Sequence, residues 1–314
     1  MIKNYLNQII SSQNRFFKLA KDAKRLPHIA FSSFLLPLLF IAAGLLLTQF
    51  AIVPLTVGDI KQLPNFYEEL FMLFVPFILV VFTIFLWVKF FEKRSFYTIG
   101  FTKENLLRKY LFGFGTGVLM MSLIVGLMAL TGTIVVNQNS RIGSEAIGGV
   151  ILFLFAYIIQ GGAEEISTRG WQFQVIGARY KPWIGALVSS LFFTVMHLTN
   201  KGVNVLCLIN LFLFAVLLVS YVMNDGSIWS ACGWHSAWNW TLGNVFGLKV
   251  SGIHGGTVSL LNLSASGPDF ITGGPFGPEG SIFATFIFST GILWMTIYIY
   301  RKNKQNNDLL NVCL

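Results

Sequence analysis

Charge is what this sequence has least of. Of its 314 residues, 11% are charged and 54% are hydrophobic, and the mean hydropathy is +0.68. Soluble domains usually carry about 25% charged residues, so this composition excludes an ordinary soluble protein and predicts an integral membrane protein. The net charge of +9 does not indicate a nucleic-acid partner, because the basic residues lie at the ends of apolar runs, where they set membrane topology.

Cysteine is also scarce. The three cysteines, Cys207, Cys232 and Cys313, show no metal-type spacing, and two of them lie in apolar runs. A free cysteine in such a run behaves as a small hydrophobic residue. The pattern therefore predicts neither a disulfide framework nor a cysteine metal site. The sequence shows no internal repeat, no low-complexity segment and no soluble domain.

Long apolar runs are abundant instead. A membrane-spanning helix needs about 20 apolar residues, and eight runs are candidates, of which the fourth and fifth are short and end in polar residues. The candidate spans are Ile29–Val53, Phe71–Val88, Tyr110–Val136, Ile147–Gly162, Trp183–Leu198, Val203–Met223, Ile228–Leu248 and Ile282–Tyr300. We expect an all-α membrane protein with about eight transmembrane helices in one bundle.

The ends of the chain differ from this bundle. Residues 1–27 are basic, with apolar side chains at near-helical spacing, and predict an amphipathic helix on the cytoplasmic membrane surface. Residues 28–301 form the expected bundle, and residues 302–314 the expected cytoplasmic tail. The longest loop, residues 251–281, is rich in Gly, Ser and Pro and is expected on the outer side.

The distribution of basic residues predicts an orientation. With the N-terminus in the cytoplasm, the cytoplasmic segments hold 18 of the 22 Lys and Arg residues. An excess of positive charge marks cytoplasmic loops. We therefore expect a multi-pass protein of a bacterial cell membrane with both termini in the cytoplasm.

Two adjacent carboxylates follow the fourth apolar run. They are Glu164 and Glu165, and Arg169 comes shortly after them. A charge at membrane depth costs about 2.5–3.5 kcal/mol on insertion scales, so charged residues at this position indicate a functional site. On a helix, Glu165 and Arg169 are four residues apart and predict an ion pair, whereas Glu164 points about 100° away and stays free for chemistry. The alternative is a solvated salt bridge at a helix end.

Two histidines in later runs extend this group. His197 ends an apolar run, with Phe193 one turn earlier as an aromatic wall, and His235 lies one turn before Asn239. A single histidine or asparagine in an apolar run more often forms a hydrogen bond between helices than takes part in catalysis. However, nearly all ionisable residues inside the runs belong to this set, which favours one shared cavity. The candidate site residues are Glu164, Glu165, Arg169, His197, His235 and Asn239.

Three motifs together resemble one known family. They are Glu164-Glu165-xxx-Arg169, Phe193-xxx-His197 and His235-xxx-Asn239, in this order on separate apolar runs. This arrangement resembles the CPBP family, the CAAX-protease and bacteriocin-processing (ABI) intramembrane proteases. The resemblance covers about residues 89–300, and residues 270–281 resemble the loop before the last helix of many bacterial members. It implies an eight-helix bundle and peptide-bond hydrolysis.

The resemblance also implies roles for these residues. Glu164 would act with His197 as the general base that activates a water. His235 and Asn239 would donate hydrogen bonds to the tetrahedral oxyanion. Glu165 and Arg169 would hold the helix and orient Glu164. No cofactor is required by this mechanism.

Two other functions use the same residues. A glutamate and two histidines are also a plausible zinc set with one open position, although the motif His-Glu-xx-His is absent. A non-catalytic transporter, immunity protein or scaffold is the other alternative, because intramembrane Glu and His also build proton relays. The absence of a repeated half weakens the transporter reading.

The expected substrate is a membrane-associated or lipidated peptide or protein. The outer Gly/Pro loop favours a bacterial protein, and hence a role in peptide maturation or bacteriocin immunity. The lipid bilayer is an expected partner and nucleic acid is not. The sequence does not predict the cleavage site or the oligomeric state.

Overall fold

The computed structural model describes residues 10–137, 144–253 and 257–312. The regular secondary structure of these residues is helical, apart from a two-stranded ribbon, in which β1 (Ile134–Val136) pairs antiparallel with β2 (Leu263–Ala265), and an isolated β-bridge between Val250 and Ile253. Six of its helical segments are long and apolar enough to cross a membrane. These segments are Phe31–Thr56, Asn65–Phe91, Leu106–Leu130, Ala146–Arg179, Val205–Asp225 and Ile282–Gln305.

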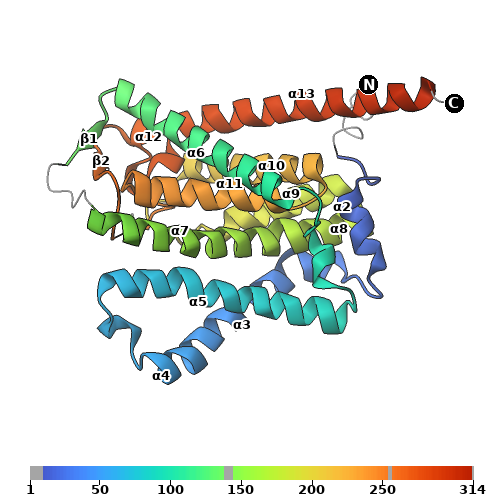
Figure 1. Ribbon diagram of the computed structural model, residues 1–314, viewed down its shortest axis with the longest axis horizontal. Coiled ribbons are helices and arrows are strands. Elements are labelled where there is room, and N and C mark those ends of the chain that lie inside the picture. Colours follow the sequence, from blue (N-terminus) through green and yellow to red (C-terminus); the bar gives the residue numbers. More distant parts are fainter. Residues whose placement is uncertain (1–9, 138–143, 254–256, 313–314) are drawn as a thin grey trace.

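The helices form one layered bundle (Figure 1). Its longer helices are α3 (Leu36–Leu47), α5 (Asn65–Leu86), α6 (Leu106–Leu130), α7 (Ser144–Glu165), α9 (Pro182–Met196), α10 (Val205–Asp225), α11 (Trp229–Trp240) and α13 (Ile282–Val312). The short ones are α2 (Arg15–Lys18), α4 (Val53–Thr56), α8 (Gln174–Arg179) and α12 (Asp269–Thr272). In the view of Figure 1, α13 lies on one side of the bundle and α3 with α5 on the other, with α7, α10 and α11 between them.

Two of the eight expected spans are shorter than a full membrane crossing. The fifth corresponds to α9, an apolar helix of 15 residues, and the seventh to α11, which a π-helical turn continues to Val245. Every residue from Ser230 to Asn239 is buried. A helix buried on all sides has to match its neighbours rather than the bilayer, so the apolar run predicts the helix here but not a full span.

Two other helix boundaries were predicted wrongly. The third run was expected to reach Val136, but α6 ends at Leu130, the chain turns at Gly132 with φ 72°, and β1 follows. The fourth apolar run was expected to be a short span that ends at Gly162, but the spanning segment is longer and runs as one helix from Ala146 to Arg179, through the Glu165 and Arg169 positions that were expected to be helical. Charge ends an apolar run in the sequence, but a charge that is paired inside the protein does not end the helix.

The N-terminal segment shows no continuous amphipathic helix within its described residues, 10–27. Within its described part, α2 is followed by a 3₁₀ turn, and the Phe16 and Phe17 side chains are buried. Both rings pack against Phe173, with centroids 5.6 and 5.2 Å away. The aromatic side chains are therefore part of the protein core. Residues 1–9 lie outside the described residues.

In the view of Figure 1, the two described ends of the chain lie at the same end of the bundle. In Figure 1, α2 and the last turns of α13 lie opposite the end that holds β1, β2 and α12. The expected tail continues α13 as helix as far as Val312. The cytoplasmic orientation of this end and the division of the chain into three parts stay predictions.

Glycines bring α6 and α11 into backbone contact. A Cβ atom at Gly113 would lie 2.0 Å from the Ser230 carbonyl oxygen, and one at Gly233 would lie 2.1 Å from the Tyr110 carbonyl oxygen. Small residues allow such close approach between membrane helices. This contact fixes the position of α11, which holds two of the predicted site residues.

Gly113→Ala tests this contact. Because the added methyl group meets a backbone oxygen rather than a movable side chain, we expect a loss of about 1–3 kcal/mol of stability, the usual cost of overpacking. Gly115→Ala on the same helix is the matched control, because nothing lies within 4 Å of its new Cβ. The midpoints of thermal unfolding in detergent should separate the two variants, and equal midpoints would contradict the packing argument.

Candidate active site

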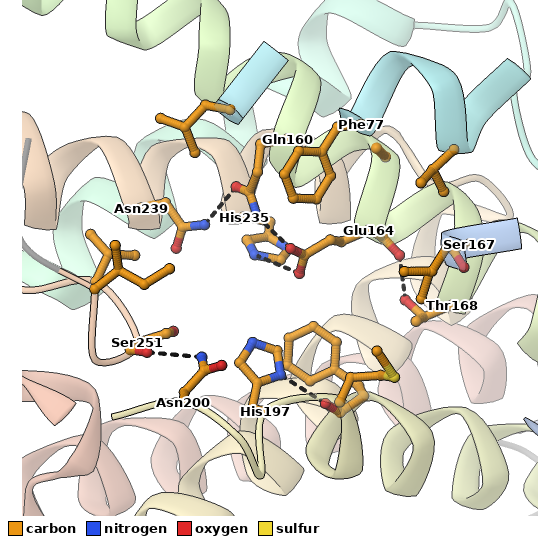
Figure 2. A pocket seen from close by; sticks show the side chains of 18 of the residues that line it. Phe77, Gln160, Glu164, Ser167, Thr168, His197, Asn200, His235, Asn239 and Ser251 are labelled. Atoms are coloured by element: carbon orange, nitrogen blue, oxygen red, sulfur yellow. Dashed lines mark hydrogen bonds and ion pairs between the residues drawn. The ribbon is translucent and has the colours of Figure 1, made fainter. Parts of the chain in front are cut away.

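A cavity of about 460 Å³ lies inside the bundle, among side chains from α3, α5, α7, α9, α10 and α11. Of the predicted site residues, Glu164, His197, His235 and Asn239 line this cavity. Figure 2 shows Glu164 and His235 on one wall and His197 on the facing wall. The structure therefore brings together side chains from three separate helical segments.

Glu164 presents one carboxylate oxygen to the cavity. Its side chain is 24% exposed, and its Oε2 lies 3.8 Å from His235 Nε2. Its Oε1 accepts a hydrogen bond from the Nε2 of Gln160, one helical turn earlier. The two oxygens thus have different surroundings, and Oε2 is the one left open.

Glu165 lies behind the cavity wall and forms the predicted ion pair. Its Oε1 is 3.0 Å from Arg169 Nη1, and both side chains are fully buried. Arg169 also donates to Thr168 Oγ1 at 2.7 Å, and its guanidinium carbon lies 4.5 Å from the centre of the Phe193 ring. The pairing at four-residue spacing is confirmed. The alternative of a solvated salt bridge is wrong, because the pair is out of contact with solvent.

His235 is held by the same carboxylate. Its Nδ1 lies 2.9 Å from Glu165 Oε1, and the ring is 3% exposed. Since an ionised carboxylate only accepts hydrogen bonds, Nδ1 carries the hydrogen. The ring also packs edge-on against Phe214, with centroids 4.9 Å apart. These contacts turn Nε2 of His235 toward Glu164.

His197 stands where α9 breaks off. The helix ends at Met196, and His197 is its C-terminal cap. Its Nδ1 is 2.8 Å from the Phe193 carbonyl oxygen, which can only accept, so Nδ1 is the donor. Nε2 is then the nitrogen that remains available to the cavity. The ring of Phe193 covers the imidazole as predicted, with centroids 4.7 Å apart.

Asn239 faces a residue that sequence reasoning missed. Its Nδ2 donates to Gln160 Oε1 at 2.8 Å, and Gln160 in turn donates to Glu164. Gln160 is the only amide side chain in the fourth apolar run, four residues before Glu164. That spacing was a usable signal, because residues four apart share a helix face.

Glu279 is a second missed residue of the cavity wall. It lies in the 3₁₀ turn Pro278–Gly280, is 5% exposed, and lines the cavity. Its Oε1 accepts from Trp238 Nε1 at 2.8 Å, and its Oε2 accepts from Ser251 Oγ at 3.0 Å and from the Ser251 amide. Burial raises the pKa of the Glu279 carboxyl, and the hydrogen bonds from Trp238 and Ser251 oppose that shift.

The turn that holds Glu279 is fixed from the bundle core. The side-chain amide of Asn210 on α10 donates to the carbonyl oxygens of Glu279 and Ser281, both at 2.8 Å. No local pattern in the Gly/Pro-rich loop predicts this placement, because the side chains that hold the turn, Asn210 on α10 and Trp238 on α11, are far from it in the sequence.

The zinc alternative was tested on the arrangement of possible ligands. Within residues 10–137, 144–253 and 257–312, no group of three His, Cys, Asp or Glu side chains is arranged to hold a metal ion. The predicted set of Glu164, His197 and His235 therefore does not fit a zinc site with three protein ligands.

Comparison with known proteins gives one match. Residues 146–241 match the family model described as type II CAAX prenyl endopeptidase Rce1-like. This segment contains every predicted site residue, from Glu164 on α7 to Asn239 on α11. No curated protein and no solved structure matched the chain. The match confirms the resemblance seen in the motifs: over residues 146–241, less than half of the chain, the protein is similar to the Rce1-like type II CAAX prenyl endopeptidases, which are peptidases.

Proposed function

We propose that the protein is an intramembrane endopeptidase in which Glu164 activates a water that attacks a peptide bond. The observation behind this proposal is that a carboxylate oxygen of Glu164 and the Nε2 atoms of two imidazoles are all available to one cavity within apolar helices. Each imidazole is held through its Nδ1, so the free nitrogens are oriented before a substrate binds.

The proposed reaction begins with a water between Glu164 and His197. Glu164 Oε2 takes a proton from this water while the oxygen attacks the peptide carbonyl carbon. The tetrahedral intermediate then collapses, the carbon–nitrogen bond breaks, and the proton on Glu164 passes to the leaving amine. His197 Nε2 accepts a hydrogen bond from the attacking water and so orients it.

His235 and Asn239 are the proposed oxyanion donors. His235 can donate through Nε2 when both ring nitrogens carry a proton, and Asn239 retains one amide hydrogen beyond the one given to Gln160. Losing one such donor typically costs about 10²–10³ in rate. Glu165 would position His235 through Nδ1, while Arg169 balances the buried charge of Glu165.

The proposed substrate is a membrane-associated or lipidated peptide or protein. Much of the cavity wall is apolar, and α3 and α5 contribute a group of apolar side chains to it. This group consists of Ile41, Leu45, Met72, Leu73, Pro76, Phe77 and Val80. Such a wall suits an apolar segment of a substrate beside the polar groups that act on the peptide bond. Peptide maturation or bacteriocin immunity in a bacterial cell membrane is the role we propose.

Comparative peptidomics tests this function. Membranes from cells that express the wild type, Glu164→Ala or Glu104→Gln would be compared for new peptide termini. Glu104 is the control because it is an exposed carboxylate paired with Arg15, far in the sequence from the cavity residues. We expect termini that appear with the wild type and the control and disappear with Glu164→Ala. If no terminus depends on Glu164, the peptidase proposal fails, and a binding function that survives Glu164→Ala would favour a scaffold.

A further inference from the structure

A hydrogen-bonded chain of three side chains crosses one wall of the cavity. Asn239 Nδ2 donates to Gln160 Oε1 at 2.8 Å, and Gln160 Nε2 donates to Glu164 Oε1 (Figure 2). Gln160 is 7% exposed and Asn239 is 5% exposed. The chain therefore joins the proposed base on α7 to a proposed oxyanion donor on α11 in a setting with little solvent.

The carboxylate of Glu164 sets the direction of this chain. An ionised carboxylate can only accept hydrogen bonds, so Gln160 has to turn its NH₂ group toward Glu164. The oxygen of Gln160 then faces Asn239, which has to turn its own NH₂ group toward Gln160. One charge thus fixes the orientation of two amide groups.

Within the described residues, Gln160 donates the side-chain hydrogen bond that the Glu164 carboxylate accepts. His235 Nε2 is farther from that carboxylate, at 3.8 Å. The Thr168 hydroxyl donates to the backbone carbonyl oxygen of Glu164, not to its carboxylate. The last torsion of a glutamate side chain has broad, weakly preferred minima. Without Gln160 the carboxylate would rotate, and the oxygen that faces the cavity would no longer be defined.

We propose that Gln160 is a positioning residue that holds Glu164 Oε1, leaves Oε2 as the oxygen that takes the proton, and orients the amide of Asn239. This inference rests on the proposed peptidase function. Because the transferred proton goes to Oε2, the hydrogen bond from Gln160 to Oε1 persists through the reaction. Gln160 does not touch the reacting atoms and acts through its two neighbours.

Gln160→Glu gives a test with a specific pH signature. The new side chain has nearly the same shape as glutamine, but when ionised it has no hydrogen to give and repels Glu164. When protonated, it again donates one hydrogen bond to Glu164 and accepts one from Asn239. Two adjacent carboxyls then share one proton. The singly protonated pair is active, so kcat is expected to fall as the pH rises and the shared proton is lost.

The measurement is kcat and KM against pH, on a peptide substrate that the wild type cleaves in liposomes. We expect the alkaline limb of the kcat profile of Gln160→Glu to lie at least about one pH unit below that of the wild type, a shift expected for strongly interacting carboxyls. Gln160→Ala should lower kcat by about 10- to 100-fold, as a misplaced catalytic group does, with little change in KM. Gln62→Glu, at an exposed position, is the control and should match the wild type.

The outcomes separate this inference from the proposed function. An active wild type with inactive Glu164→Gln supports the peptidase, and a wild-type pH profile in Gln160→Glu would then overturn the role of Gln160 alone. The role would also be overturned if both Gln160 variants lost activity in proportion to a lowered unfolding midpoint with an unchanged profile. If Glu164→Gln cleaved as fast as the wild type, the peptidase mechanism itself would fail.

Discussion

Glu164→Gln is expected to lower kcat by about 10²–10⁴-fold, the usual contribution of a positioned general base. The amide has the shape of the carboxylate and can still accept the hydrogen bond from Gln160 through its oxygen. It cannot take a proton from water, because an amide nitrogen has no basic lone pair. The fold should remain intact, because the variant removes a charge that has no ion pair with Lys or Arg in the described residues.

Single-turnover cleavage of a peptide in liposomes measures this effect separately from product release. The same preparations are compared by thermal unfolding in detergent, and their midpoints should agree. Glu104→Gln again serves as the control, since it removes a carboxylate from the surface rather than from the cavity. Retention of activity within tenfold of the wild type would show that another group is the base.

Arg169→Met is expected to destabilise the protein by about 3–5 kcal/mol, the cost of leaving one member of a buried ion pair without its partner. Glu165 and Arg169 are both fully buried and 3.0 Å apart. In the wild type, Glu165 Oε2 and two guanidinium nitrogens of Arg169 already have no hydrogen-bond partner among the described residues. Besides the bonds of Glu165 to His235 and of Arg169 to Thr168, the two charges offset each other, and removal of either member leaves the other without its ion-pair partner.

A double-mutant cycle tests the coupling. Glu165→Gln with Arg169→Met removes both charges, and we expect it to recover a large part of the stability lost in Arg169→Met, because no buried charge is left unpaired. The midpoint of thermal unfolding in detergent is the measurement. Additive losses would contradict the ion-pair argument. Activity should stay low in the double variant, because His235 Nδ1 loses its ionised partner.

The surface pair of Arg15 and Glu104 provides the comparison. Their side chains are 46% and 67% exposed, and exposed ion pairs contribute little to stability because water already solvates both charges. Glu104→Gln should therefore leave the unfolding midpoint nearly unchanged. The contrast with Arg169→Met attributes the large effect to burial rather than to ion pairing in general.

Local spacing was sufficient for several features of the site. The ion pair between Glu165 and Arg169 and the contact of Phe193 with His197 each join residues four apart on one helical segment. Helix geometry fixes such neighbours wherever the helix lies. The bond from Gln160 to Glu164 is of the same kind and was open to prediction by the same rule.

The helix boundaries show where hydropathy alone fails. Hydropathy ended the fourth span at Gly162, but the spanning helix includes charges that are paired inside the protein and reaches Arg179. In the same way, α11 is shorter than a membrane span because other helices surround it. Whether a residue faces lipid, water or protein is a property of the packed bundle, and that environment decides what a charge costs.

The sequence by itself determined the membrane class, the family motifs and the contacts within single helical turns, because composition and helical periodicity depend only on neighbouring residues. Only the tertiary structure decided that Asn239 bonds to Gln160 and that Glu279, from the loop before α13, reaches the cavity. These contacts join residues far apart in the chain. Their geometry follows from how the helices pack. At the interface of α6 and α11, Gly113 and Gly233 set this packing, because a single added methyl group at either position would meet the backbone of the facing helix.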